Sequence, residues 1–366
     1  MAQIGIDARL TYYRDGGIST YIQQMVKALA QIDHDHAYTV FHSRKDQRVI
    51  EPTLGRKALW TPAHHRFERV ALSMELAWRG LDVFHSPDFI PPHRGAKRHV
   101  ITVHDLTFLH YPNYLTSDSR TYYNAQIEQA CQDADHILAV SAHTRHDLIE
   151  ILSVPENKIT VQPHGVNPHY RPLPIEQVEP VQKALNLPDT YILHVGTWEP
   201  RKNIIGLLRA YRHLLADMPD LPPVVLVGRE GWLFQQTRAE IDTLGINQHV
   251  IWRDQVSDVQ LPAVYNRALV NVNLSHYEGF GMPSLEGMAC GIVPIVSDRS
   301  SLPEVVGDVG LCVPPDDTIQ IAEALKHALI DQAWRGEQAQ LALARAQQFT
   351  WERSAQIARN TYTALL

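Results

Sequence analysis

Cysteine is scarce in this chain of 366 residues, which has three: Cys131, Cys290 and Cys312. So small and odd a number cannot form a disulfide framework, so we expect a protein of the reducing cytoplasm. No group of cysteines and histidines has the spacing of a zinc site. Long apolar runs are also missing, which predicts that no helix spans a membrane. The N-terminus lacks the pattern of a signal peptide.

Positive charge is not in excess. The formal net charge is −7 with all 20 histidines neutral, which argues against nucleic acid as a partner. Hydrophobic residues make up 45% of the chain and charged residues 20%, so each half can form an ordinary globular core. The length favours two domains over one.

Short apolar runs alternate with amphipathic segments, which indicates repeated β-α-β units. In the first half we expect strands near residues 4–6, 38–41, 83–85, 100–103, 137–140 and 159–161, and helices over 18–31, 67–80, 120–134 and 142–152. In the second half we expect strands near residues 191–195, 224–227, 250–252, 270–274, 293–296 and 311–313, and helices over 204–215, 235–244, 261–267, 283–289 and 319–330. These patterns predict an α/β protein with two Rossmann-like domains, whose ligands bind beyond the carboxyl ends of the strands.

A proline-rich segment at residues 167–190 interrupts the alternation. We interpret it as the connection between a first domain, residues 1–170, and a second domain, residues 187–349. The final stretch, residues 351–366, is expected to form a helix.

The most informative stretch is His276–Asp298, which reads HYEGFGMPSLEGMACGIVPIVSD. It contains two carboxylates, Glu278 and Glu286, and carboxylates accept hydrogen bonds from sugar hydroxyls. A Gly-Phe-Gly turn between them allows a ligand close to the backbone, and Pro283 begins a short helix whose N-terminus favours an anion. The combination suits a sugar attached to a nucleoside diphosphate.

Two adjacent cations, Arg201 and Lys202, follow the first expected strand of the second half. Arginine can bind a diphosphate through two parallel hydrogen bonds and lysine as a point charge, so the pair could neutralise a diphosphate leaving group. A solvated basic pair is the commoner role of such a dipeptide. The position at the end of a strand favours ligand binding here.

Two segments of the first half also follow expected strands. Gly16 and Gly17 precede an amphipathic helix, where a glycine loop can approach a phosphate. Their spacing does not match the dinucleotide-binding fingerprint, and a plain tight turn is the simpler alternative. His104 directly follows an apolar strand. A lone histidine is more often structural than catalytic, but placement at a strand end favours a functional role.

Metal-binding patterns are weak. Two Asp-x-Asp sequences, at residues 33–35 and 133–135, lie after a helix and at a helix end, so we interpret them as turns and caps. His143 and His146 share a helix face but lack a third ligand. We predict no catalytic metal and no cofactor.

Basic residues gather in the first half at residues 44–48, 64–69 and 94–99. Acidic residues interrupt these clusters, which favours ordinary solvated charge. The alternative is an electropositive face that meets anionic lipid or a pyrophosphate-linked acceptor.

The spacing of Glu278 and Glu286, with seven residues between them, resembles the Glu-x7-Glu motif of retaining glycosyltransferases of the GT-B fold, in particular glycosyltransferase family 4. The resemblance extends from residue 16 to residue 352 and is strongest over 191–315. It includes the His-Asp-Leu sequence at His104 and the segment between Gly196 and Lys202. The family's usual arginine directly after this glycine is replaced by threonine, and Arg201 is the substitute.

The resemblance implies two Rossmann-like domains that face each other across a cleft, with the C-terminal helix, residues 351–366, returning to the first domain. It also implies roles for matching residues. Glu286 would bind the ribose, Glu278 the sugar, Arg201 and Lys202 the leaving diphosphate, and His104 would orient the sugar. The other donor-binding positions that it implies are Gly16, Gly17, Gly196, Gln255, Val256, Gly279, Phe280, Gly281, Met282 and Pro283.

We therefore expect a metal-independent hexosyltransferase that uses a GDP or UDP sugar, with GDP-mannose as the first choice. Its acceptor would be a saccharide or a polyprenyl-linked glycan of cell-surface polysaccharide assembly. It would act in the cytoplasm, with peripheral contact at the inner face of the membrane. Two alternatives remain at this point: a sugar-nucleotide epimerase of the same fold, and a non-catalytic protein that binds nucleotide sugars.

Overall fold

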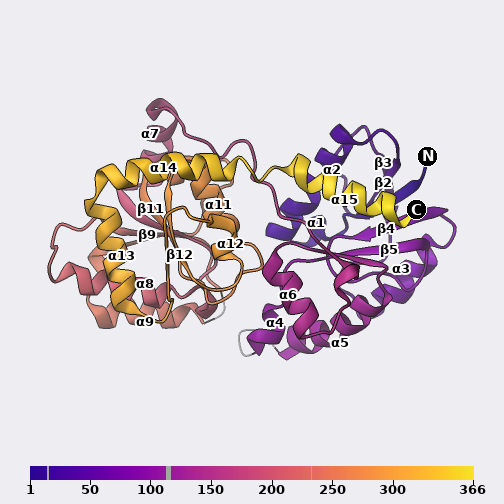
Figure 1. Ribbon diagram of the computed structural model, residues 1–366, viewed down its shortest axis with the longest axis horizontal. Helices are drawn as coiled ribbons and strands as arrows, with labels where there is room; N and C mark the ends of the chain where they lie inside the picture. The colour runs from indigo at the N-terminus through magenta and orange to yellow at the C-terminus, as the bar shows by residue number, and fades with distance from the viewer. Residues whose placement is uncertain (15, 113–116, 232) are drawn as a thin grey trace. The chain divides into compact units, whose positions relative to one another are not determined.

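A computed structural model describes residues 1–366 except residues 15, 113–116 and 232 (Figure 1). The chain divides into two compact units, one formed by residues 1–165 and 349–366 and the other by residues 166–348. Each unit is built on its own parallel sheet with helices packed against it. The α/β fold with two Rossmann-like domains, expected from the alternating pattern, is confirmed.

The first unit contains a seven-stranded parallel sheet. Across the sheet the strands are β3 (Gly55–Leu59), β2 (Ala37–Ser43), β1 (Gln3–Asp7), β4 (Leu81–Ser86), β5 (Ala96–Val103), β6 (His136–Ala139) and β7 (Ile159–Val161). The strand order reverses between β1 and β4. In sheets of this type a ligand site is expected beyond the carboxyl ends of the strands at such a reversal.

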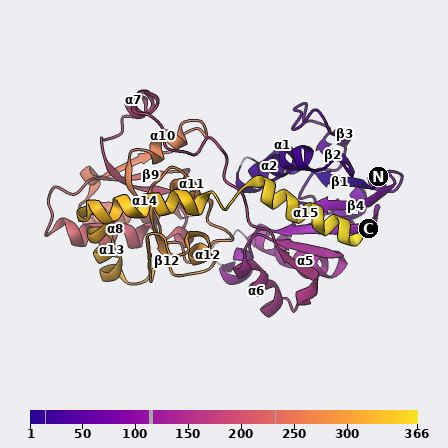
Figure 2. The same ribbon diagram turned by 45° about the horizontal axis from the view of Figure 1, so that its top comes forward.

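The helices of the first unit flank this sheet. They are α1 (Leu10–Tyr13), α2 (Gly17–Ile32), α3 (Glu68–Leu76), α4 (Thr107–His110), α5 (Ser117–Asp133), α6 (Ala142–Glu150) and the C-terminal α15 (Trp351–Leu365). Figure 2 shows α15 beside α2, and the two helices pack closely along their length. Ile6 of β1, Tyr21 of α2 and Tyr362 of α15 are fully buried in the same core. The expected return of the C-terminal helix to the first domain is therefore confirmed.

The second unit contains a six-stranded parallel sheet. Across the sheet the strands are β10 (Val250–Arg253), β9 (Val224–Val227), β8 (Tyr191–Val195), β11 (Ala268–Asn273), β12 (Val293–Ser297) and β13 (Leu311–Val313). This is the Rossmann strand order, and it reverses between β8 and β11. The helices are α7 (Ile175–Ala184), α8 (Ile204–Leu215), α9 (Phe234–Leu244), α10 (Leu261–Tyr265), α11 (Met282–Ala289), α12 (Leu302–Val306), α13 (Thr318–Ile330) and α14 (Gln332–Ala346).

Several elements differ from the sequence expectation. Strand β3 was not expected, because four of its five residues are exposed at the sheet edge and its sequence, Gly-Arg-Lys-Ala-Leu, is polar. Helix α7 occupies part of the proline-rich segment, with Pro180 inside it, and this segment groups with the second unit. Helix α14 was also missed. Among the described residues, no helix is long and apolar enough to cross a membrane.

One glycine controls how closely α15 meets the first unit. A Cβ atom at Gly165 would lie 2.2 Å from the Trp351 nitrogen and 2.5 Å from the Thr350 carbonyl carbon. Both contacts are with backbone, which cannot move aside without shifting the start of the helix. We therefore expect Gly165→Ala to destabilise the protein by about 2 kcal/mol or more.

The matched control is Gly336→Ala in α14, where a Cβ atom would meet no atom within 4 Å. Because alanine is the better helix former, this control should be neutral or stabilising by about 0.5–1 kcal/mol. Urea unfolding of both variants measures the difference. Equal midpoints for Gly165→Ala and the wild type would contradict the close packing of α15 at this glycine.

Candidate functional site

The two chain segments that follow β8 and β11 meet at the carboxyl edge of the second sheet. The β8 segment ends in a turn of 3-10 helix, Pro200–Lys202, and the β11 segment leads to Glu278. The His276 amide donates a hydrogen bond to the Arg201 carbonyl at 2.9 Å, which joins the two segments. Beyond Lys202, Asn203 adopts a left-handed conformation with φ of +51°, and its side chain caps the start of α8. These contacts hold both cations at the sheet edge.

Arg201, Lys202 and Glu278 form one ion-paired cluster. The Lys202 Nζ atom lies 2.5 Å from Glu278 Oε1, and Arg201 Nη1 lies 2.9 Å from Glu278 Oε2. Arg201 also donates to the Tyr277 carbonyl at 2.6 Å, and the Ser275 hydroxyl donates to Glu278 at 2.7 Å. The sequence predicted all three charged residues to lie near a ligand but did not predict that they bind one another.

The cluster is buried, and its charges depend on each other. Burial acts to raise the pKa of Glu278, but the neighbouring Lys202 and Arg201 outweigh burial and lower this pKa to about 2. Burial lowers the pKa of Lys202, and Glu278 opposes that effect. Glu278 is therefore ionised at neutral pH. Arg201 Nη2 also lies 3.4 Å from Glu199 Oε2, so the cluster holds two cations and two carboxylates. Lysine and arginine each have several N–H groups, so the two cations at the end of the strands can also bind an anion.

Two further groups support this cluster and were not singled out from the sequence. His194 on β8 is buried, and burial lowers its pKa to about 4, so its ring is neutral. Its Nδ1 atom lies 2.9 Å from the Val272 carbonyl and donates to it. The Glu278 amide donates to the Ser300 hydroxyl at 2.8 Å, and Ser300 itself has a left-handed backbone with φ of +52°. Single serines and histidines carry no spacing signal that could have revealed these contacts.

The glycine turn after Glu278 leads directly into α11. Gly281 has φ of +103°, a conformation that favours glycine, and a Cβ atom there would lie 2.7 Å from Leu302. The turn also includes Gly279 and Phe280. Helix α11 then begins at Met282, with Pro283 in its first turn and no side-chain cap. A helix start of this kind presents its positive dipole end toward the glycine turn.

Glu286 lies on α11 in a different environment from Glu278. It is half-buried, and its Oε2 atom accepts a hydrogen bond from Tyr265 at 3.0 Å. Burial, together with the charge of Asp258, raises the pKa of Glu286 to about 8, against opposing hydrogen bonds from Tyr265 and Tyr170. Tyr170 in turn donates to Asp258 at 2.9 Å. Glu286 is therefore largely protonated at neutral pH in this structure.

His104 lies in the first unit, directly after β5. Its Nε2 atom is 2.8 Å from the Pro87 carbonyl. Since a carbonyl can only accept, Nε2 carries the proton and Nδ1 is left as an acceptor. The ring packs edge-on against Tyr21 and stacked against His164. Burial lowers the pKa of His104, so the imidazole is neutral. The structure thus shows a positioned, neutral histidine at a strand end.

The remaining residues singled out from the sequence lie in loops or at the start of a helix. Gly16 and Gly17 lie at the start of α2, where Gly16 precedes the helix without a side-chain cap. Gly196 directly follows β8, and a Cβ atom there would lie 3.4 Å from the His194 ring. Gln255 and Val256 lie between β10 and α10, with Gln255 exposed and Val256 half-buried.

The Asp-x-Asp sequences have structural partners. Asp33 is buried and accepts hydrogen bonds from Tyr38 at 2.6 Å and His36 at 2.7 Å. Asp133 pairs with Arg69. In the part of the chain that the structure describes, no three histidine, cysteine or acidic side chains are grouped as metal ligands would be.

Comparisons with known proteins match both units. The model of the family "Glycosyl transferases group 1" matches residues 176–347, and that of "Glycosyltransferase Family 4" matches residues 15–170. The chain is 34% identical to O-antigen chain mannosyltransferase B of Escherichia coli, over 95% of this chain and 96% of that protein.

Solved structures show the same fold at low sequence identity. Sucrose-phosphate synthase of Thermosynechococcus elongatus superposes with a TM-score of 0.79 at 22% identity and covers 100% of both chains. The Anabaena protein HepE, in complex with UDP and glucose, superposes with a TM-score of 0.75 at 16% identity, over 99% of each chain.

The raised pKa of Glu286 gives a testable dependence of stability on pH. Its value of about 8 lies above the ordinary 4.5, so the folded protein keeps a proton that the unfolded chain releases. The free energy of unfolding should therefore fall as pH rises from about 4.5 to 8. Glu286→Gln removes this loss. Without nucleotide, the free energy of unfolding of the variant relative to that of the wild type should therefore rise by about 2 kcal/mol from pH 5.5 to pH 8.5. This is less than the full shift implies, because a half-buried group is partly screened.

Denaturant unfolding at the two pH values measures the effect. Glu323→Gln, at an exposed position on α13, is the matched control and should show no such gain. A gain for Glu286→Gln that does not change with pH would show that the carboxyl group is already ionised at pH 5.5.

Proposed function

The chain belongs to the glycosyltransferases that combine a family 4 domain with a group 1 domain, and on that premise we propose that it transfers mannose from GDP-mannose, with retention of anomeric configuration, to a hydroxyl group of a glycan or lipid-linked acceptor. The observation that carries this proposal is the cluster of Arg201, Lys202 and Glu278, next to the glycine turn and the start of α11. It places cationic N–H groups beside a carboxylate, which would suit a diphosphate and a sugar hydroxyl respectively.

The relatives support the choice of sugar and pathway. The O-antigen chain mannosyltransferase of Escherichia coli matches nearly the full length of this chain. HepE, whose fold is the same, has been observed with UDP and glucose, which supports a nucleoside-diphosphate sugar as the donor class. We therefore propose a role in cell-surface polysaccharide assembly, at the cytoplasmic face of the membrane.

Arg201 and Lys202 are proposed to bind the donor's diphosphate and to stabilise the charge that develops on it as the sugar leaves. In the structure their donors are engaged with Glu278 and the Tyr277 carbonyl. A lysine ammonium has three N–H groups and an arginine guanidinium has five, so both can bind phosphate oxygens while they keep Glu278 in place. The amides around Gly279–Met282 and the start of α11 would add to this anion site.

Glu278 and Glu286 are proposed to bind different parts of the donor. Glu278 would accept hydrogen bonds from hydroxyls of the sugar, since it is ionised and fixed by three donors. Glu286 would bind the ribose hydroxyls. Gly196, Gln255 and Val256 would line the nucleotide site, and main-chain groups at the last two would contact the base.

His104 is proposed to orient the transferred sugar. It belongs to the first unit, so this role requires both units to act on a donor held by the second. The Nδ1 atom of the neutral ring carries no proton, so it can accept a hydrogen bond from a sugar hydroxyl. Gly16 and Gly17 would approach the donor phosphate or the acceptor. The leaving phosphate would take the proton of the acceptor hydroxyl in a front-face attack.

A nucleotide panel tests the donor. GDP should raise the melting temperature more than UDP or dTDP, because a ligand that binds only the folded state stabilises by about 2.7 kcal/mol at a hundredfold excess over Kd. GDP-mannose with a mannose-terminated acceptor should give an α-linked product, identified by NMR. Stabilisation by UDP alone would contradict the choice of base, and a C2 epimer formed without acceptor would identify an epimerase.

The same assay tests the proposal that no metal takes part. Transfer should persist in EDTA, since Arg201 and Lys202 provide the positive charge that a divalent ion supplies in other transferases. Loss of transfer in EDTA and its recovery with Mn²⁺ would overturn that part of the proposal.

A pair of variants tests the division of roles. His104→Ala should leave GDP affinity within about twofold and lower turnover by about a hundredfold, because its contact is with the sugar and misplacement of a reacting group has a cost of this order. Glu286→Ala should weaken GDP binding instead. Calorimetry and a product assay measure both. Equal losses of GDP affinity in the two variants would show that His104 does not act on the sugar.

A further inference from the structure

Helix α3 of the first unit has apolar side chains on its outer face. Phe67, Val70, Met74 and Trp78 follow one another at spacings of three or four residues, so they lie along one side of the helix. All four are exposed, Trp78 most of all at 94%. The helical turn continues past the end of α3 through Ala77, which has φ of −51° and ψ of −31°.

The opposite side of α3 already serves the core. Leu72 and Leu76 are fully buried against Phe41 and Phe84 of the sheet. The outer apolar side is therefore not needed to fold the first unit. An apolar side chain that stays exposed contributes no hydrophobic free energy to folding. A group of such side chains on one face indicates a surface that binds a partner.

Trp60 extends this surface beyond the helix. It follows β3 and is 70% exposed. Its amide donates to Glu75 Oε2 of α3 at 2.7 Å, which holds it beside the helix. The Arg44 guanidinium lies 4.0 Å from its ring centre. We call Trp60, Phe67, Val70, Met74 and Trp78 the apolar stripe.

Cations surround the apolar stripe. Residues 44–98 contain eleven lysines and arginines against six aspartates and glutamates, a formal excess of +5 in a chain whose total is −7. Two of these cations, Arg69 and Arg98, pair with Asp133 and Asp135 outside this range. Besides Arg44 over Trp60, the Arg66 guanidinium lies 4.6 Å from the Phe67 ring centre, and the exposed Arg79 directly follows Trp78. Two rings of the stripe, Trp60 and Phe67, are thus in direct contact with positive charge.

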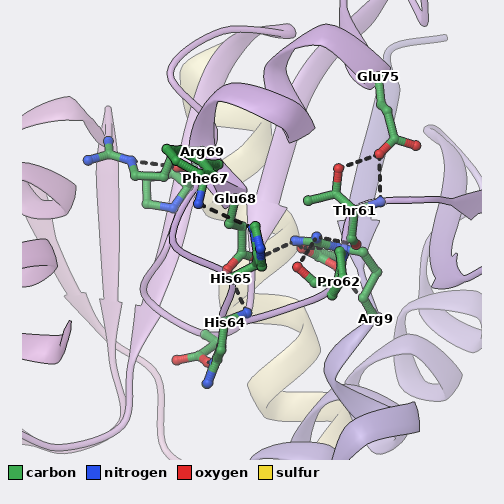
Figure 3. A network of polar contacts seen from close by, with 12 residues as sticks. Arg9, Thr61, Pro62, His64, His65, Phe67, Glu68, Arg69 and Glu75 are labelled. Atoms are coloured by element: carbon green, nitrogen blue, oxygen red, sulfur yellow. Dashed lines mark hydrogen bonds and ion pairs between the residues drawn. The ribbon is translucent and has the colours of Figure 1, made fainter. Parts of the chain in front are cut away.

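Two carboxylates near the stripe, Glu68 and Glu75, are bound by neighbouring groups, and Figure 3 shows Glu75 bound to Thr61. Glu68 is buried, binds Arg9 at 2.6 Å and accepts from the His64 amide at 2.7 Å. Glu75 accepts from the amides of Trp60 and Thr61, both at 2.7 Å. Acidic residues interrupt the basic clusters in sequence, but these two are occupied by backbone or buried partners.

We propose that the apolar stripe and its arginines bind a membrane surface that contains anionic phospholipid. Tryptophan and phenylalanine insert at the boundary between headgroups and acyl chains, while arginines bind the lipid phosphates. Charge complementarity is what selects a lipid surface over a neutral partner. This proposal concerns binding, so it can be tested independently of the proposed sugar and donor.

Flotation of the full-length protein with vesicles tests the proposal. One set contains phosphatidylcholine alone, and the other contains roughly one third phosphatidylglycerol. Binding should be at least about tenfold stronger to the anionic vesicles and should weaken in high salt. Met74→Ser/Trp78→Ser should reduce it by about tenfold or more, and Arg44→Ser/Arg66→Ser should reduce the preference for anionic lipid.

The matched control is Ile330→Ser/Leu341→Ser, which removes two apolar side chains of 59% and 50% exposure from the second unit. It should float like the wild type. Thermal melting of all variants and GDP binding should be unchanged, which separates this proposal from the proposed reaction. The proposal is overturned if the wild type does not float, if it binds both vesicle types equally, or if the stripe variant floats as well as the control. It is equally overturned if the stripe mediates self-association, seen as a dimer in sedimentation that Trp78→Ser abolishes.

Discussion

The second unit depends on one buried carboxylate held between two cations. Glu278 and Lys202 are each less than a tenth exposed, and an isolated charge in such a place costs several kcal/mol. The three charges of the cluster therefore have to stay together, and this keeps the loop after β8 against the loop after β11. The glycine turn and the start of α11 come directly after Glu278, so their position follows from the same pairing. Removal of either side would leave the other buried and uncompensated.

That Arg201 and Lys202 lie at the edge of the sheet could be predicted from the sequence because they follow an apolar strand, while Glu278 and Glu286 were recognised by the glycine turn and by their spacing. Parallel strands end at a common edge, so residues far apart in the chain, such as Lys202 and Glu278, are expected to meet there. The supporting groups could not be predicted in this way. Ser300 binds the Glu278 amide and His194 binds the Val272 carbonyl through single side chains of common types. These contacts depend on how neighbouring strands pack, so the sequence around each residue contains no pattern that predicts them.

The helices and strands that the sequence predicts also differ from those that it does not by whether they carry a local pattern. The buried strands and the helices with one apolar face produce clear periodicity, and the sequence predicts them well. Strand β3 does not, because an edge strand with exposed faces needs no apolar alternation. Helix α14 was missed because few of its residues are buried: only Ala342 and Ala346 are, and alanine gives a weak apolar signal. Helix α7 was hidden by the prolines around and inside it.

Buried charges must be paired, and this requirement has a different result in each unit. In the second unit the buried Glu278 binds Lys202 and Arg201 at the end of the strands, where we propose that a diphosphate binds. In the first unit Arg9 binds the buried Glu68 and backbone amides bind Glu75, while Arg44 and Arg66 lie against the exposed rings of Trp60 and Phe67. A count of charges along the sequence does not show which cations are paired with carboxylates and which are not. The side on which each carboxylate finds its partner decides whether a basic segment is neutralised or stays positive, and only the folded chain determines that side.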